Sequence, residues 1–442
     1  MRLLEKTSSD ISDILKGNKK NIPTNQYSGR SIFAESIQKS LTDPFTGSIL
    51  NIPDINILEY NNPKILLSVD RGQLESIFGK NLGSFNNISI GSHPDFEHLK
   101  YNQFCYHHCI SMFLDIKGST QLSLKYSLLD IRQIKDTILS AAIEVVNFFG
   151  GHVQRLQGDG LMIQFVRAGQ APLDSIINSL NAASVLTYFT KNELANTFIE
   201  NDVKPLRIRI GIDYGKEQEV LWSHYGVDNC TELTTTSLHT DLSAKLQQRA
   251  PSNSILIGDN IKTTIDLPDE FYYFPTLTKE TGEKVDDKYI FNNSYKMYQF
   301  DWEKYLLSHP YFYRDSDGTS IKINTNTKFD IKCEIKRPGA DFYTTYFPNS
   351  SAMPKDTEIK YHLFHNGRPI GLNGYKILWE AENRGLEVQK YPNAIKHNFD
   401  RLYDNKTICE TTASYLGHHY LKCKIERLGM DNLKLKFPIF VQ

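Results

Sequence analysis

The sequence predicts an α+β protein in which an α/β sandwich is followed by an antiparallel β-sandwich. Between residues 104 and 300, segments with helical periodicity alternate with strand-like segments, a pattern typical of helices packed on a sheet. From about residue 315, short β-rich runs follow one another between turn signals, with no helical segment among them. We therefore expect an N-terminal extension (1–100), an α/β domain (101–305) and a β-sandwich domain (315–442).

Length, charge and cysteine usage exclude several classes of protein. The 442 residues carry a net charge of −1, so no basic excess points to nucleic acid as a partner. No apolar run approaches the roughly 20 residues that a membrane helix needs. The six cysteines are scattered and follow no secretory signal, which favours free thiols and a cytoplasmic location.

The N-terminal extension contains predicted helices and a strand but no candidate catalytic or binding residues. Apolar spacing predicts a short helix at 9–16 and another at 32–41, and residues 64–70 are typical of a strand. Residues 81–95 are rich in Gly, Asn and Ser and indicate a linker. We expect this region to be an arm that packs on the α/β domain or on its partner.

The α/β domain contains three strong helical patterns and several strands. Apolar residues recur at steps of three and four in the predicted helices at 127–150, 174–198 and 238–249. Strands are predicted at 110–114, 152–154, 161–165, 206–213 and 254–258. The aromatic segment 266–300 is expected to form a terminal hairpin that closes the sheet.

Two carboxylates stand out within these elements. Asp115 ends the strand at 110–114, directly before a Gly-Ser-Thr turn, and Asp159 occupies the Gly-flanked tip of the next hairpin. A hairpin beside the first strand can bring both side chains together. Two carboxylates at strand ends beside such a turn predict a divalent-metal site next to a phosphate cradle.

The segments Phe113-Leu-Asp-Ile-Lys-Gly-Ser-Thr120 and Gly158-Asp-Gly160 resemble the paired motifs of the class III nucleotidyl cyclases. The resemblance covers roughly residues 104–300 and implies a ferredoxin-like core. It implies two Mg²⁺ or Mn²⁺ ions per site, held by Asp115, Asp159 and the carbonyl group of Ile116. It also implies that the turn holds the β- and γ-phosphates of a nucleoside triphosphate through Lys117, Gly118, Ser119 and Thr120.

The family resemblance further implies a homodimer with composite active sites. In such cyclases one protomer gives the metal ligands, while the other gives the base pocket and a transition-state Asn and Arg, four residues apart on a helix. The matching positions here are Asp241 and Lys245, so both depart from the family pattern. Arg249, one turn further, is the alternative source of the transition-state cation.

The same resemblance predicts which residues contact the base. Arg155 stands four residues before Asp159, where purine-specific relatives carry Lys, and Thr234 stands seven residues before Asp241. A guanidinium has only donors, which suits the adjacent O2 and N3 acceptors of cytosine better than uracil. CTP is therefore the first expectation for the substrate and UTP the second.

The C-terminal segment, including Tyr375–Glu387 and Tyr415–Tyr420, resembles the sensor domain of some bacterial cyclases. The whole chain is similar to the pyrimidine cyclases of bacterial Pycsar antiphage systems, which implies a cyclic pyrimidine nucleotide that activates a separately encoded effector. Two alternatives remain open. Instead of an active enzyme, the chain could be a catalytically silent module that binds a nucleotide and signals through the sandwich. It could also be a purely structural dimerisation module.

Overall fold

The computed structural model describes residues 4–17, 69–81, 83–227, 230–278, 284–285, 287–325, 327–369, 374–398, 406–427 and 432–442. The helix predicted at 32–41 lies outside these residues, as do residues 64–68 of the predicted strand. The helix predicted at 9–16 is confirmed as α1 (Glu5–Gly17). A helix that was not predicted, α3 (Arg71–Phe78), begins at Asp70, whose side chain accepts a hydrogen bond from the Gln73 N–H.

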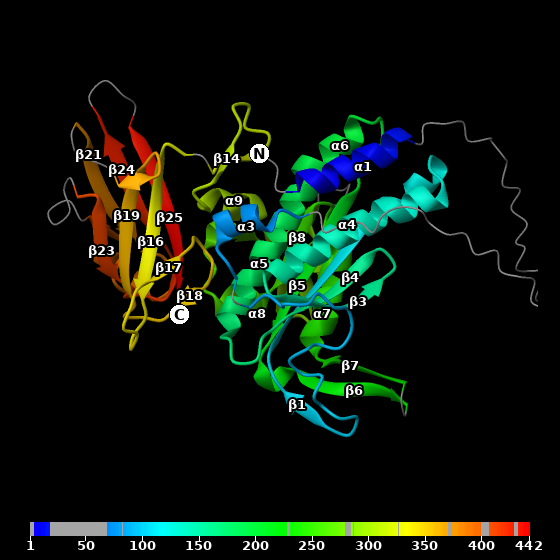
Figure 1. Ribbon diagram of the computed structural model, residues 1–442. Coiled ribbons are helices and arrows are strands. Elements are labelled where there is room, and N and C mark those ends of the chain that lie inside the picture. The colour runs from blue at the N-terminus through cyan, green and yellow to red at the C-terminus, as the bar shows by residue number, and fades with distance from the viewer. Residues whose placement is uncertain are drawn as a thin grey trace, which may run out of the picture.

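An eight-stranded sheet forms the centre of the N-terminal part (Figure 1). Its strand order is β12-β13-β8-β5-β2-β4-β3, and β9 also pairs with β13. The central strand β2 is antiparallel to both of its neighbours, β4 and β5. The strands are β2 (Cys109–Lys117), β3 (Gly151–Gln157), β4 (Gly160–Phe165), β5 (Arg207–Gly215), β8 (Ser254–Gly258), β9 (Tyr272–Tyr273), β12 (Ile290–Phe291) and β13 (Tyr295–Phe300). The terminal hairpin predicted at 266–300 therefore does close the sheet.

The predicted long helices are confirmed and cover the two faces of this sheet. They are α4 (Leu128–Phe148), α5 (Pro172–Tyr188), which continues through a π-helical turn into α6 (Ala195–Ile199), and α7 (Leu238–Arg249). Alternate apolar residues of β2 and β5 share one core with α4 and α5. On the other face α7 packs so closely that a Cβ at Gly211 would lie 2.2 Å from the Gln247 nitrogen. Glycine at 211 thus lets α7 approach the sheet.

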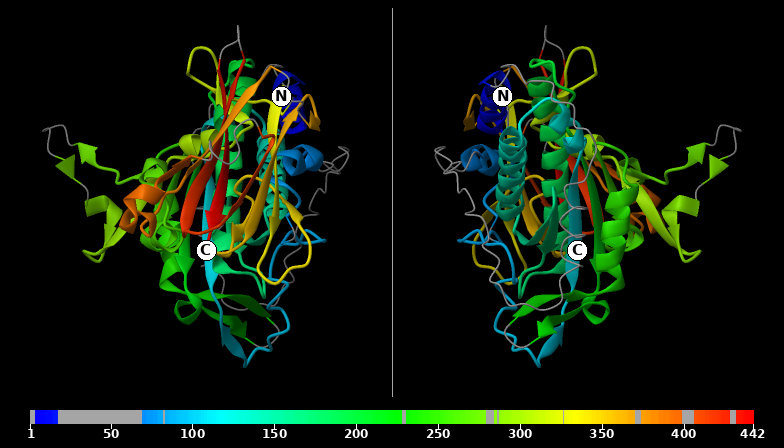
Figure 2. Two further views of the ribbon diagram at one scale, coloured as in Figure 1. Left: turned by 90° about the vertical axis from the view of Figure 1, so that its left-hand side faces the viewer. Right: turned by 90° about the vertical axis from the view of Figure 1, so that its right-hand side faces the viewer.

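A second, three-stranded sheet projects from one end of the central sheet (Figures 1 and 2). It consists of β1 (Phe104–Tyr106), β6 (Leu221–Val227) and β7 (Cys230–Thr236). The sequence around β1 predicts a strand, but β6 and β7 were not predicted, because many of their residues are polar and the apolar alternation of a half-buried strand is weak. This small sheet positions one of the charged residues of the candidate site.

The C-terminal part is a sandwich of two five-stranded sheets. One contains β16 (Phe329–Lys336), β17 (Thr344–Tyr346), β19 (Glu358–His365), β20 (Arg368–Pro369) and β23 (Ile408–Thr412). The other contains β18 (Ala352–Met353), β21 (Lys376–Glu382), β22 (Lys396–Asn398), β24 (Gly417–Glu426) and β25 (Leu433–Val441). The predicted antiparallel sandwich is confirmed, except that the short β18 pairs with β25 in parallel.

The sandwich packs directly on the N-terminal part. Helix α9 (Trp302–Ser308) and the hairpin of β14 (Phe312–Arg314) and β15 (Ile321–Ile323) follow the last strand of the central sheet and precede the sandwich in sequence, whereas helix α8 (Asp259–Thr264) follows β8. Tyr420 and Phe440 of the sandwich belong to the same buried core as α5 and α9. In the described part of the chain, no helix combines the length and the apolar character that crossing a bilayer requires.

Candidate active site

Strand pairing brings Asp115 and Asp159 together, as the sequence predicts. Asp115 lies near the end of β2, opposite Gly160 of β4, and Asp159 occupies the turn between β3 and β4. The Ile116 N–H donates to the backbone carbonyl of Asp159 at 3.3 Å. A Cβ at position 160 would lie 2.8 Å from the Leu114 carbonyl oxygen, so glycine permits this close approach.

Each carboxylate is paired with one cation that the sequence did not single out. Arg209, opposite Asp115 on β5, forms an ion pair with it, and the Lys135 ammonium lies 3.5 Å from Oδ2 of Asp159. The Arg209 guanidinium also donates to the Gln248 carbonyl at 3.3 Å. Arg209 belongs to an alternating strand pattern and Lys135 to an amphipathic helix, so only the tertiary structure reveals their partners.

The turn after β2 has the form that the phosphate-cradle hypothesis requires. Gly118 adopts a left-handed conformation with φ of 97° and begins a short 3₁₀ helix, Ser119–Leu124. Ser119 is buried, and its hydroxyl donates to Asp159. Lys117 and Thr120 are exposed on either side. The turn therefore connects directly to the second carboxylate.

The donor set at this point fits a divalent cation. Both carboxylates and the nearby backbone carbonyls are hard oxygen donors, the type that Mg²⁺ and Mn²⁺ prefer. Among the described residues, no cluster of three or more His, Cys, Asp or Glu side chains surrounds them. Mg²⁺ is commonly bound by one or two carboxylates together with substrate phosphates, so this sparse set suits an ion that arrives with a nucleotide.

Arg155 is held in a small network at the base of the projecting sheet. A β-bulge interrupts β3 between Val153 and Arg155. Arg155 forms an ion pair with Glu232 of β7, and its Nε donates to Oε1 of Gln154 at 3.0 Å, while the Gln154 amide donates to Glu232. Glu232 and the buried Thr234 are two residues apart on β7, so their side chains share one face. The structure thus brings Arg155 to the Thr234 strand and adds Glu232, which was not predicted.

The three predicted residues of α7 do not bond directly to the carboxylate pair within the described part of the chain. Asp241 is exposed, the Lys245 ammonium lies 4.5 Å from the centre of the Phe291 ring, and Arg249 lies 3.4 Å from the sulfur of Met297. In the described part of the chain, no hydrogen bond or ion pair joins any of them to Asp115 or Asp159. The end of α7 still approaches the site, because the Gln248 carbonyl accepts from Arg209, the partner of Asp115.

The chain is similar to known families and proteins over most of its length. Residues 301–440 match the family model of the adenylyl/guanylyl and SMODS C-terminal sensor domain. A cytidylate cyclase from Staphylococcus aureus is 36% identical over 359 residues, which cover 79% of this chain and 82% of that protein. A cytidylate cyclase from Escherichia coli is 33% identical over 340 residues, which cover 73% of this chain and 70% of that protein.

Among solved structures, the adenylyl cyclase CyaB from P. aeruginosa matches 45% of this chain and 95% of that chain, with 19% identity and a TM-score of 0.36. The family assignment itself follows from the sequence relatives, because their identity extends over most of both proteins. The chain belongs to the cytidylate cyclase family, and its residues 301–440 form a C-terminal sensor domain.

Proposed function

We propose that this protein converts CTP to 3′,5′-cyclic CMP and pyrophosphate. The relatives described above are cytidylate cyclases, which gives CTP precedence among the four nucleotides. The observation that carries the proposal in this chain is the pairing of Arg155 with Glu232 on the strand of Thr234. In this pair the N–H donors of the Arg155 guanidinium lie beside the acceptor oxygens of the Glu232 carboxylate.

The hydrogen-bonding edge of cytosine complements this pair. The Arg155 guanidinium donates to O2 and N3, and the Glu232 carboxylate accepts from the exocyclic amino group. Uracil presents an N3–H to the guanidinium and a carbonyl oxygen to the carboxylate, so both contacts are mispaired. UTP remains the second candidate substrate, since relatives with a similar fold act on other bases and pocket shape also contributes.

The carboxylate pair would hold the divalent ions, with the Ile116 carbonyl as a further ligand. Mg²⁺ or Mn²⁺, two per site, supplies positive charge that lowers the pKa of the ribose 3′-hydroxyl and neutralises the triphosphate. Asp115 and Asp159 then no longer need Arg209 and Lys135 as counter-ions. Both cations become available to the phosphates, beside the turn of Gly118. Ser119 holds the Asp159 carboxylate in place through its hydroxyl.

The active species would be a homodimer with composite sites. One protomer gives the carboxylates and the phosphate turn, and the other gives Arg155, Thr234 and the α7 residues. Lys245 or Arg249 would neutralise charge at the α-phosphate, and Asp241 takes the place of the family Asn. This arrangement is supported by the contacts of Lys245 and Arg249, which face the β12–β13 hairpin and form no described hydrogen bond or ion pair with either carboxylate.

The biological role follows from the Pycsar resemblance. The product would act as a second messenger in antiphage defence by activating a separately encoded effector, and neither nucleic acid nor membrane would be needed. The proposed domains are the extension (1–100), the cyclase (101–305) and the sensor-like sandwich (315–442).

Product identification tests the proposal. The purified protein is incubated separately with each of the four nucleoside triphosphates and Mn²⁺, and products are resolved by chromatography and mass spectrometry. We expect cyclic CMP from CTP at a rate well above that of any other product. Faster cyclisation of ATP or GTP would refute the pyrimidine assignment, faster UTP turnover would make it a uridylate cyclase, and binding without turnover would indicate a silent module.

A further inference from the structure

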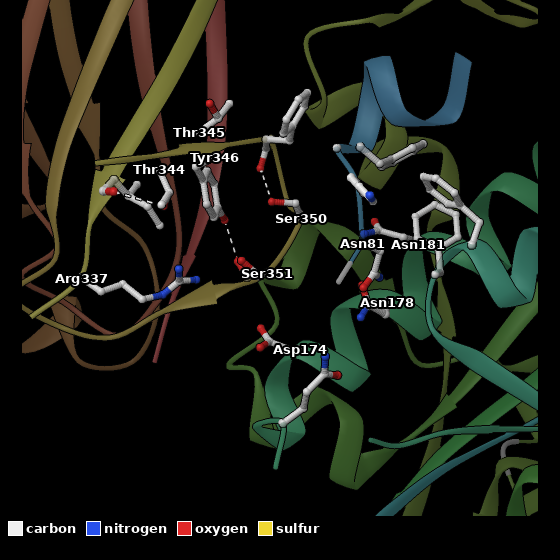
Figure 3. Close-up of a pocket in the computed structure, with 18 residues that line it drawn as sticks. Asn81, Asp174, Asn178, Asn181, Arg337, Thr344, Thr345, Tyr346, Ser350 and Ser351 are labelled. Atoms are coloured by element: carbon white, nitrogen blue, oxygen red, sulfur yellow. Dashed lines mark hydrogen bonds between the residues drawn. The ribbon is translucent and has the colours of Figure 1, made fainter. Parts of the chain in front are cut away.

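A partly open cavity with polar and aromatic walls lies where the sandwich meets the cyclase part (Figure 3). Its volume is about 420 Å³, within the range of small-molecule sites. The cyclase half of its wall comes from the end of α3, the end of α4 and the first half of α5, and the sandwich half comes from β16, β17 and the following loop. The cavity is therefore shared by both parts of the chain and is separate from the carboxylate site.

Helix α5 presents three polar side chains to this cavity at helical spacing, Asp174, Asn178 and Asn181 (Figure 3). Two of them are engaged. Asp174 accepts from the Ala352 N–H at 2.7 Å, and the Asn181 amide accepts from the Tyr305 hydroxyl at 2.9 Å and donates to the Asn349 carbonyl at 2.9 Å. These contacts tie the helix to the sandwich.

Asn178 differs from its neighbours. It is 5% exposed, yet its side chain has no hydrogen-bond partner among the residues that the structure describes. Its amide is nevertheless not sealed from the cavity, so water can bond it there when no ligand is present. A bound ligand would replace that water and satisfy both the donor and the acceptor of the amide.

The charges around the cavity favour an anion. Arg337 extends from the end of β16 toward the cavity, and Lys80 follows α3 on the opposite wall (Figure 3 labels Arg337). Neither side chain forms an ion pair within the described residues. The single acidic residue of the wall is Asp174, whose pKa is raised by burial although the Ala352 N–H and Arg337 oppose this. A guanidinium is well suited to bind phosphate through two parallel hydrogen bonds.

We propose that this cavity binds a phosphate-bearing small molecule of mononucleotide size, with its phosphate on Arg337 and its hydrogen-bonding portion on Asn178. The ring of Phe347, which also lines the cavity, offers an apolar surface for the ligand. The site would act as an effector site, since its two walls belong to the catalytic and the sensor-like parts. This inference does not depend on which triphosphate the enzyme cyclises.

The cavity has a short structural path to the candidate active site. Phe148 and Phe149, at the end of α4, line the cavity, and the chain then enters β3 through Gly150. Strand β3 carries Arg155 and leads to the turn of Asp159. A ligand that fixes the end of α4 thus acts on the element that positions both a base contact and a metal ligand.

Binding measurements on the full-length protein test the proposal. The probes are 5′-CMP, 5′-AMP, 3′,5′-cyclic CMP and inorganic phosphate. Their binding is measured by calorimetry and by thermal melting, in the absence of any nucleoside triphosphate. We expect at least one nucleotide probe to bind the wild type and to raise its Tm. Arg337→Ala and Asn178→Leu should each weaken that binding about tenfold to a hundredfold, the cost of losing a charge-assisted or buried hydrogen bond.

Three controls distinguish this site from others. Asn178→Leu replaces an unpartnered amide by an apolar group of similar size, so the free variant should melt no lower than wild type. Arg368→Ala removes an exposed arginine of the same sandwich, outside the cavity, and should leave binding unchanged. Arg155→Ala should weaken only binding at the candidate active site. Absence of binding by every probe, or binding that Arg155→Ala abolishes and Arg337→Ala does not affect, would overturn the proposal.

Discussion

Asp115 and Asp159 show how strand pairing concentrates negative charge at one point of the sheet. Their backbones are joined through the hydrogen bond between Ile116 and Asp159, and each carboxylate has its own cation, Arg209 or Lys135. Exposed or half-exposed ion pairs of this kind contribute little to stability. Replacing these carboxylates should therefore affect chemistry far more than folding.

Asp115→Asn and Asp159→Asn should each lower kcat/KM with CTP by at least roughly a hundredfold, or about 3 kcal/mol of transition-state stabilisation, because each removes a negatively charged oxygen ligand. Steady-state kinetics with Mn²⁺, together with thermal melting, measure both effects. Asp136→Asn removes an exposed carboxylate next to Lys135 in sequence and serves as the matched control. Near-normal turnover in either site variant would show that the metal assignment is wrong.

Glu232 is the residue whose role depends most on the proposed base contact. Glu232→Gln should lower the preference for CTP over UTP by about ten- to a hundredfold, since an amide can present its N–H₂ group to the uracil carbonyl. Arg155→Ala should reduce CTP turnover without changing the metal dependence.

The preference is measured as the ratio of kcat/KM values for the two nucleotides. Glu217→Gln, at an exposed position outside this network, is the control. An unchanged ratio in Glu232→Gln would show that Glu232 does not contact the base, so that Arg155 would be the only one of the two that recognises it.

At the scale of the element, α7 is anchored at its first turn by a buried polar network. His239 Nδ1 lies 2.9 Å from Oδ2 of the fully buried Asp213, and the Tyr295 hydroxyl donates to the other carboxylate oxygen at 2.6 Å. Nε2 of His239 lies 3.4 Å from Glu219. The network fixes the helix that carries Asp241 and Lys245.

This anchor should make stability depend on pH. Burial lowers the pKa of His239, but the hydrogen bond and negative charge of Asp213 outweigh it, so the pKa lies above its ordinary value of 6.5. The stabilisation by protonated His239 is therefore fully present below pH 6.5 and is lost as the pH rises through the raised pKa. His239→Gln should cost about 3 kcal/mol at the acidic end of this window, because a buried carboxylate loses its counter-ion.

The measurement is the difference in Tm between wild type and His239→Gln, followed from pH 6 upward. The difference should shrink as the pH rises. His98→Gln, at an exposed histidine, should show no comparable trend. A difference that stays constant across the range would mean that the histidine is neutral throughout.

At the scale of the whole molecule, the proposed site residues fall into two groups that no direct hydrogen bond or ion pair joins within the described residues. The carboxylates contact Arg209 and Lys135, whereas Lys245 and Arg249 contact the hairpin of β12 and β13. If a dimer builds each site from one group of each protomer, two inactive variants can complement each other in a mixed dimer. A complementation experiment therefore tests the composite site.

Co-expression of Asp115→Ala and Lys245→Ala chains with different affinity tags should yield heterodimers with one intact site. Each mixed dimer has one intact site of two, so about half of the wild-type activity per dimer is expected after purification. Tandem purification isolates the mixed dimers, and each variant expressed alone is the control. Mixed dimers as inactive as the parent variants would show that each chain builds its site by itself.

Local patterns in the sequence were sufficient to predict most of the long helices and strands of this protein. Helical periodicity predicted α4, α5 and α7, and β-rich runs predicted the five long strands of the sandwich, β16, β19, β21, β24 and β25, because these elements bury one continuous apolar face. The Asp115–Asp159 juxtaposition was also predictable, since a hairpin next to the first strand leaves the two residues few other positions. Whether these residues bind metal, and whether Arg155 and Thr234 read the base, stay predictions.

Other features depended on contacts between distant segments. Glu232 meets Arg155 only because β7 folds against the bulge in β3, and the polar composition of β7 gave no sign of a strand. The partners of Arg209 and Lys135 and the cavity around Asn178 likewise arise from packing between elements. The sequence by itself determined the elements and the carboxylate pair, because neighbouring residues encode periodicity and turns. The tertiary structure alone decided which charged and polar groups face one another, because their positions depend on how whole elements pack.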